Sequence, residues 1–224
     1  MFSVIFEVHP KPEKFGLYLE LAKTLRPILE EIDGFIDNER FESADRPGWL
    51  LSHSTWRDEK SVVRWRTVGK HHETQQRGRD EVFQDYRLRV GEVVRDTDPP
   101  AGTAIVEKRL DETEVGRAKF VTLTEVQPES GATARALTEW LSADRDPTDL
   151  IDYDVFASIS KPGKLALLAS WRDRVSAEKF SPPTSGGLRN RVVRVVRDYG
   201  MFDRRESPQY YPEILPETMP RGNS

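Results

Sequence analysis

The chain has no cysteine, which excludes disulfide bonds, a thiolate nucleophile and cysteine metal ligands. It has no apolar run near the roughly 18 residues that cross a bilayer, and its start lacks the basic and cleavage segments of a signal peptide. We therefore expect a cytoplasmic protein without a membrane partner. The 34 basic and 38 acidic residues are interspersed and leave a net charge of −4, which gives no sign of a nucleic-acid partner. Glycine-rich nucleotide loops and the GxSxG and HExxH motifs are also missing, so nucleotide-dependent enzymes, serine hydrolases and zinc proteases have no support.

What the chain does contain is one pattern that occurs twice. Trp171 repeats the sequence surroundings of Trp56 at an offset of 115 residues, and flanking segments match in the same order at offsets of 118 and 102. The matched segments are residues 2–10 with 120–128, 36–41 with 151–156, 47–58 with 162–173, and 93–96 with 195–198. Chance does not readily produce four collinear matches, so the sequence predicts a tandem duplication.

The first copy has the hydrophobic spacing of a β-α-β-β-α-β unit. Its strands show alternation or β-branched and aromatic residues, and its first helix has one apolar stripe closed by a glycine. The predicted elements are strands at 2–8, 35–43, 48–56 and 86–94, a helix from Tyr18 to Ile32, and a second helix after the N-cap Asp58. The predicted fold class is therefore α+β, with two ferredoxin-like units packed sheet to sheet.

The duplication divides the chain into a first copy (1–97), a linker (98–117), a degenerate second copy (118–204) and a proline-rich tail (205–224). The prolines of the tail exclude a helix or a central strand there. A disordered tail and an extended arm laid on the body remain as the alternatives.

Two segments of the first copy carry a more specific pattern. One strand ends in the sequence Ser-Thr-Trp-Arg-Asp at residues 54–58, and a helix with Trp65 leads to His71 and His72. Together with the order of elements, these segments resemble the antibiotic biosynthesis monooxygenase family of the dimeric α+β barrel superfamily. Single-domain members of that family pair two sheets across a dimer interface. The resemblance therefore implies a pseudo-dimer within one chain, with the two units forming an intramolecular α+β barrel, and it leaves a further homodimer open.

The resemblance implies a cofactor-independent monooxygenase that oxidises a phenolic, quinol or polyketide-like aromatic substrate with molecular oxygen. Other members degrade haem with an Asn on the first strand, a Trp on the second helix and a His ten residues later. Here Trp65 fits, but Gln75 stands where the His is needed and the first strand has no Asn, so haem degradation is disfavoured. The alternatives are a non-catalytic small-molecule-binding protein of the same fold and a haem binder that uses His72.

Trp65 and His72 are the leading catalytic candidates. If their helix continued unbroken, both side chains would share one face, and a histidine near pKa 6.5 can take a proton from a phenol at neutral pH. The same geometry points His71 elsewhere. His53, on a strand, is a second candidate base, although a histidine in a strand is more often structural. The competing interpretation is that Trp65 packs in the core and both helical histidines lie on the surface.

The internal comparison adds substrate-binding candidates, because neutral polar residues of the first copy are replaced in the second. The predicted substrate-binding residues are Asn38, Arg40, Trp49, His71 and Tyr86. Drift at unconstrained surface positions explains the replacements nearly as well. The cations Arg64, Arg66, Lys70, Arg77 and Arg79 are interpreted as a solvated helical surface. Adjacent histidines without an acidic partner are not a metal motif, so no metal is predicted. The resemblance to cofactor-independent oxygenases implies that no other cofactor is needed.

Overall fold

The computed structural model describes residues 1–127, 133–142, 149–180 and 187–211, so most of the predicted tail lies outside the described part. The strands are β1 (Phe2–Pro10), β2 (Phe35–Ser43), β3 (Leu50–Trp56), β4 (Phe83–Asp96), β5 (Phe120–Val126), β6 (Leu150–Ser158), β7 (Leu165–Trp171) and β8 (Leu188–Gly200). The helices are α1 (Phe15–Glu30), α2 (Glu59–Arg66), α3 (Gly69–Arg77), α4 (Ala134–Ser142) and α5 (Arg174–Lys179), with short turns η1 (Pro12–Lys14) and η2 (Gly78–Val82). This is the predicted β-α-β-β-α-β order twice over, with α3 and the short turns added in the first half.

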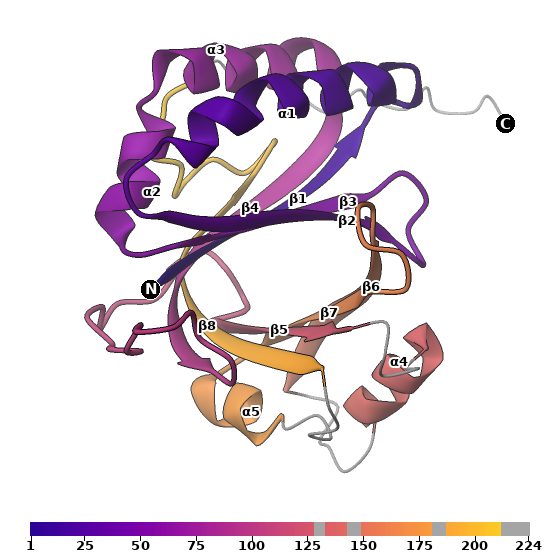
Figure 1. Ribbon diagram of the computed structural model, residues 1–224, viewed down its shortest axis with the longest axis vertical. Coiled ribbons are helices and arrows are strands. Elements are labelled where there is room, and N and C mark those ends of the chain that lie inside the picture. The colour runs from indigo at the N-terminus through magenta and orange to yellow at the C-terminus, as the bar shows by residue number, and fades with distance from the viewer. Residues whose placement is uncertain (128–132, 143–148, 181–186, 212–224) are drawn as a thin grey trace, which may run out of the picture.

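The strands form one closed barrel in the order β1-β3-β2-β6-β7-β5-β8-β4, and all neighbouring strands are antiparallel (Figure 1). Each half supplies four adjacent strands. Pairing of β2 with β6 and of β4 with β8 joins the two sets, so the outer strands of each set have hydrogen-bonding partners. The α+β class is confirmed, but the strands are continuous around one barrel and do not form two separate sheets packed on each other. A tandem origin for the two halves stays a prediction.

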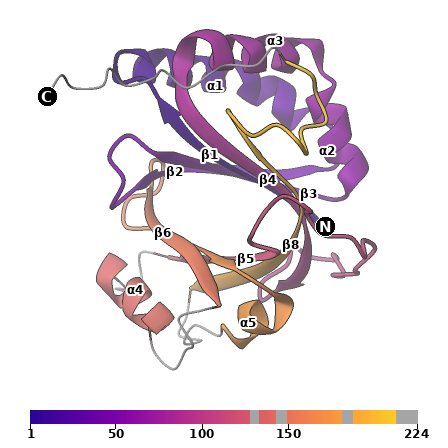
Figure 2. The same ribbon diagram turned by 180° about the vertical axis from the view of Figure 1, so that it is seen from behind.

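The helices lie outside the barrel. Helices α1, α2 and α3 cover the strands of the first half, while α4 and α5 lie on the opposite side against the second half (Figures 1 and 2). Strand β1 shows how alternation produces this arrangement, because Val4 and Phe6 face the helices while Ile5 packs in the barrel interior. No helix in the described ranges is long and apolar enough to cross a membrane.

The barrel interior holds an apolar cluster, and ion pairs join the two halves. Lys164 of the second half has a side chain only 3% exposed and lies 2.6 Å from Glu39 of the first half. Arg46 likewise reaches Asp154 at 2.6 Å. Both pairs join the two halves, and removing one partner of the buried Lys164–Glu39 pair is expected to cost roughly 3–5 kcal/mol. The Arg46 side chain is 38% exposed, so its pair with Asp154 contributes less.

Aspartate N-caps begin the helices that follow β3 and β7. The Asp58 carboxylate accepts a hydrogen bond of 2.8 Å from the backbone N–H of Ser61, which confirms the predicted cap of α2. Asp173 does the same for Ser176 at 2.9 Å at the start of α5. The matching caps place both helices at the same point after their strands.

Candidate functional site

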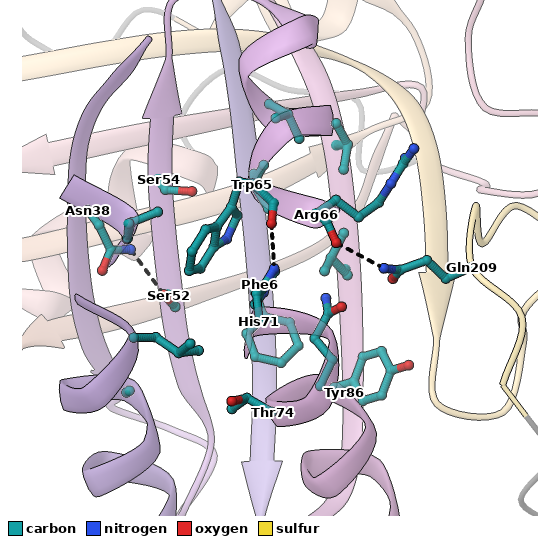
Figure 3. A pocket seen from close by; sticks show the side chains of 18 of the residues that line it. Phe6, Asn38, Ser52, Ser54, Trp65, Arg66, His71, Thr74, Tyr86 and Gln209 are labelled. Carbon is teal, nitrogen blue, oxygen red and sulfur yellow. Dashed lines mark hydrogen bonds between the residues drawn. The ribbon is translucent and has the colours of Figure 1, made fainter. Parts of the chain in front are cut away.

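A cavity of about 200 Å³ lies between the strands of the first half and the helices that cover them (Figure 3). Its apolar lining comprises Val4, Phe6, Leu88 and Val90 on the sheet, and Leu21, Leu25, Leu29, Val62 and Trp65 on the helices. An apolar protein cavity of about 150 Å³ is large enough to bind benzene. The cavity described here is larger, and it therefore suits a molecule with one or two rings.

In the second half, the space between sheet and helices is filled by side chains. Phe180, the predicted counterpart of Trp65, is fully buried in a cluster with Trp171, Leu137 and Val155. Where the first half has a cavity, the second half therefore has an ordinary apolar core. The prediction of a pocket in the first copy agrees with this difference between the two halves.

The helix that carries Trp65 does not continue to the histidines. Helix α2 ends at Arg66, Val68 adopts extended dihedral angles (φ −65°, ψ 123°), and α3 begins at Gly69. The predicted shared face of Trp65 and His72 required an unbroken helix and is wrong. The break instead brings His71 onto the indole of Trp65, with ring centroids 4.0 Å apart and planes inclined by 16°. His71 lines the cavity (Figure 3), whereas the exposed His72 does not.

The contacts of His71 define its protonation state. Its Nδ1 lies 3.0 Å from the carbonyl oxygen of Trp65. Because a carbonyl oxygen only accepts, this bond requires the proton on Nδ1 and leaves a lone pair on Nε2. Burial lowers the pKa of His71 to about 4, so the ring is neutral at pH 7. The arrangement gives the cavity a neutral imidazole that can accept a proton.

Polar side chains of β2 and β3 form one side of the cavity. Asn38 donates to the hydroxyl of Ser52 at 3.1 Å and to the carbonyl oxygen of His53 at 2.9 Å, which fixes the orientation of its amide (Figure 3). Arg40, two residues along β2, also lines the cavity, and it lies beside Tyr18 of α1. The structure thus brings both predicted residues of β2, Asn38 and Arg40, into the cavity.

A second polar group lies toward β4 and β8. The hydroxyl of Tyr86 accepts a hydrogen bond of 2.7 Å from Arg79 and one of 2.6 Å from Arg204. The prediction of a solvated Arg79 is wrong, because this residue is only 3% exposed. The turn η2, which follows α3, places Arg79 inside, and nothing in the residue spacing indicated that turn. Tyr86 was predicted as a substrate contact and does line the cavity.

Residues after β8 cross onto the first half and close one side of the cavity. Gln209 donates to the carbonyl oxygen of Arg66 at 3.2 Å (Figure 3). Tyr211 stacks on His72, with ring centroids 5.3 Å apart, and its hydroxyl lies 3.2 Å from Nδ1 of His72. Of the two predicted alternatives for the tail, its described beginning is an arm laid on the body. Sequence reasoning missed Arg204, Gln209 and Tyr211 as cavity residues.

Besides His72, two more predicted site residues, His53 and Trp49, lie away from the cavity. His53 is 2% exposed and faces the barrel interior, where its Nε2 lies 2.6 Å from the hydroxyl of Ser3. Burial, the largest of several influences, lowers the pKa of His53 to about 4. Alternation along β3 explains the position, because Ser52 and Ser54 face the cavity and His53 therefore points the other way. Trp49 stacks on His9 at 5.3 Å and does not line the cavity.

The arrangement of side chains bears on metal and haem chemistry. The described residues contain no group of three or more His, Asp or Glu side chains that could hold a metal ion. The haem-binding alternative used His72 as its ligand, and His72 is stacked on Tyr211 outside the cavity. The geometry therefore does not fit haem held by His72 in this cavity.

Comparisons with known proteins show the family of the chain. The sequence model of the family described as antibiotic biosynthesis monooxygenase matches residues 1–77. The chain is 46% identical over 217 residues to a protein of Pyricularia oryzae named jasmonate monooxygenase ABM. The matched residues cover 95% of this chain and 99% of that protein. A solved structure described as an anthrone oxidase-like protein is 13% identical, with a TM-score of 0.38, and covers 93% of this chain and 96% of its own. A putative monooxygenase from Fusobacterium nucleatum is 9% identical, with a TM-score of 0.37, and covers 88% and 93%.

Proposed function

Because the chain belongs to the antibiotic biosynthesis monooxygenase family, we propose that it is a monooxygenase that oxidises a small one-ring or two-ring organic molecule in the cavity of its first half. The observation that carries the proposal is the placement of His71. Its neutral imidazole is stacked on Trp65 in an apolar cavity. The hydrogen bond at Nδ1 fixes the tautomer and leaves the lone pair on Nε2 to accept a proton. A base in that position makes an oxygen-reactive anion from a weakly acidic substrate.

For a phenol or quinol, the substrate itself supplies the electrons. His71 takes the phenolic proton, and the resulting anion gives an electron to molecular oxygen before a carbon–oxygen bond forms. The hydroperoxide then breaks its O–O bond, so that one oxygen atom stays as a quinone carbonyl and the other leaves as water. For 1-naphthol the balance is naphthol plus oxygen to 1,4-naphthoquinone plus water. No other redox group is needed in this reaction, and we propose that none takes part.

A jasmonate-type acid is the second candidate substrate. It is favoured by the relative named jasmonate monooxygenase, which matches this chain over nearly its whole length. Jasmonate has one five-membered ring and a carboxylate, a size that suits a cavity of about 200 Å³. Hydroxylation of a carbon–hydrogen bond needs two further electrons and two protons, so this reaction requires a reduced nicotinamide or flavin as donor.

Isotope incorporation tests the proposal. The full chain is incubated under ¹⁸O₂ with 1-naphthol, with a monocyclic dihydroquinone, and with jasmonic acid in the presence and absence of NADPH and reduced flavin. We expect one ¹⁸O atom in the product of at least one substrate, and a strong reduction in the His71→Phe variant. The matched His72→Phe variant, whose altered ring lies outside the cavity, is expected to retain turnover.

Two outcomes contradict the proposal. One is binding of these molecules without oxygen uptake, which supports the alternative of a non-catalytic binding protein. The other is unchanged turnover in His71→Phe, which removes the role assigned to this base. A tricyclic anthrone serves as a size control and is expected to react more slowly than 1-naphthol, because it exceeds the space available.

A further inference from the structure

Arg40 differs from the other arginines whose Nε is buried without an acceptor. The five arginines in this state are Arg40, Arg89, Arg95, Arg191 and Arg194. Three of the others form ion pairs through their remaining nitrogens, with Glu7, Glu125 or Glu107. The fourth, Arg95, donates to two backbone carbonyl oxygens and to Asn190.

Within the described part of the chain, Arg40 has neither an ion pair nor a carbonyl acceptor for its guanidinium. Its neighbour there is the hydroxyl of Tyr18, a residue of α1 that is 6% exposed. A guanidinium is always charged at physiological pH, and a charge held beside apolar surface without a counter-ion is unfavourable. A ligand that brings a carboxylate to this position relieves that cost, and its two oxygens match the two-pronged geometry of the guanidinium.

The second half shows that the fold does not need an arginine at this position. Arg40 pairs with Ser52 across β2 and β3, and the residues 115 positions later, Val155 and Leu167, pair in the same register across β6 and β7. Both of these apolar residues are fully buried in the core under α4 and α5. The same backbone pairing is thus stable with apolar side chains, so the charge of Arg40 has a role other than holding the sheet.

We propose that Arg40 is the specificity-determining residue of the cavity and that it selects small apolar ligands carrying a carboxylate. This inference rests on the proposed function, since it assigns a substrate class to the same cavity. Five other arginines line the cavity, namely Arg26, Arg66, Arg79, Arg197 and Arg204, and among the described residues none of these five has a buried Nε without an acceptor. Arg79 and Arg204 donate to the hydroxyl of Tyr86, Arg204 donates also to the carbonyl oxygen of Gln209, and Arg26 pairs with Glu30. Arg40 therefore receives the carboxylate.

The rest of the ligand lies along the sheet side of the cavity, from β2 toward β4. Three strand-to-strand steps separate β2 from β4 in the barrel order, a span of about 14 Å at the usual strand spacing. Phe6 and Leu88 line this path, and Tyr86 stands on the β4 side. A carboxylate at Arg40 places the apolar body of the ligand over Phe6 and beneath the paired rings of Trp65 and His71 (Figure 3).

Ligand binding to the full chain tests the inference without turnover. The probes are 4-phenylbutanoate and its methyl ester, which share their apolar body and differ in charge, and affinity is measured by calorimetry at pH 7.5. We expect the acid to bind about 10- to 100-fold more tightly than the ester, the range for a hydrogen-bonded charge. Arg40→Met is expected to remove this preference, and Arg40→Lys to keep part of it.

Controls make the outcome specific to Arg40. Arg77→Met, at an exposed arginine that pairs with Glu81 away from the cavity lining, is expected to keep the full preference. Arg40→Val, which introduces the residue found at the matching position of the second half, is expected to fold and to lose the preference. Equal affinity for acid and ester in the wild-type chain overturns the inference, as does a preference that Arg204→Met abolishes and Arg40→Met leaves intact. Oxygen uptake with uncharged phenols is measured separately, so loss of the monooxygenase proposal and loss of the carboxylate preference are distinguishable.

Discussion

His71→Phe is the variant that most directly tests the chemistry proposed for the cavity. Phenylalanine keeps an aromatic ring to stack on Trp65, at 4.0 Å in the native pair, but removes Nε2 as a proton acceptor. General-base catalysis contributes typically 10²- to 10⁴-fold, or about 3–5 kcal/mol of barrier. We therefore expect kcat for a phenolic substrate to fall by at least about 100-fold, while KM changes little.

The pH dependence of the wild-type chain provides a second measure of the same assignment. A base is active when neutral, so protonation of His71 lowers the rate as the pH falls. Burial lowers the pKa of His71 to about 4, so the acid limb of kcat/KM for the free enzyme should lie near that pH and not near 6.5. At pH 6.5 an ordinary histidine is about half protonated, whereas His71 remains more than about 99% neutral.

The assay is initial oxygen uptake with 1-naphthol between pH 4.5 and 8, a range in which no acid limb near pH 6.5 is expected. His72→Phe is the matched control, because it alters the adjacent histidine without altering the cavity lining. The reasoning is refuted if His71→Phe retains the wild-type kcat, or if the acid limb lies near pH 6.5 and persists in that variant.

Three further predictions concern the arm, the cavity and pH. Tyr211→Ala should remove the stacking on His72 and open the cavity, which raises KM about 10-fold. Tyr210→Ala, at an 89% exposed side chain, is the control and should leave KM unchanged. Equal KM values in the two variants would show that the arm does not cover the bound substrate. Ser52→Leu introduces the residue of the matching second-half position, and the larger side chain should fill the cavity. Ligand affinity measured by calorimetry should then fall by at least about tenfold, without loss of stability in urea. Retained affinity would contradict the location of the site. The pKa of buried His53 is lowered to about 4. As the pH falls from 7 to 4.5, His53 is therefore protonated in the unfolded chain before it is protonated in the folded chain. The free energy of unfolding drops by roughly 2.5 kcal/mol from this residue alone. His53→Gln should flatten that part of the urea-denaturation profile, and an unchanged slope would argue against a neutral buried histidine.

Local sequence patterns predicted much of the fold. The alternation of β1 and β3 gave the two faces of each strand, and Asp58 marked the start of α2 because an aspartate side chain caps the free N–H groups there. The same alternation separated Ser52 from His53 and so already implied that these two residues face different environments. Five of the predicted site residues line the cavity: the catalytic candidate Trp65 and the substrate-binding candidates Asn38, Arg40, His71 and Tyr86.

The remaining features depended on contacts between distant segments. The choice between His71 and His72 depends on the break at Val68, where one residue leaves the helical conformation and the register of the following turn is reset. Arg79 and Arg204 meet at Tyr86 only because a turn after α3 and a segment after β8 converge there. Such convergence has no signature in residue spacing.

The amino-acid sequence by itself determined which segments are strands and helices, which face of each is apolar, and where polar residues interrupt the first half but not the second. These properties follow from side-chain chemistry and the periods of the backbone, which act over a few residues. The tertiary structure alone decided that β2 pairs with β6 and β4 with β8 to make the barrel continuous, that His71 and not His72 reaches the cavity, and that the chain after β8 covers it. Each of these depends on the packing of segments far apart in the chain, where burial and hydrogen bonding across the whole molecule outweigh local preference.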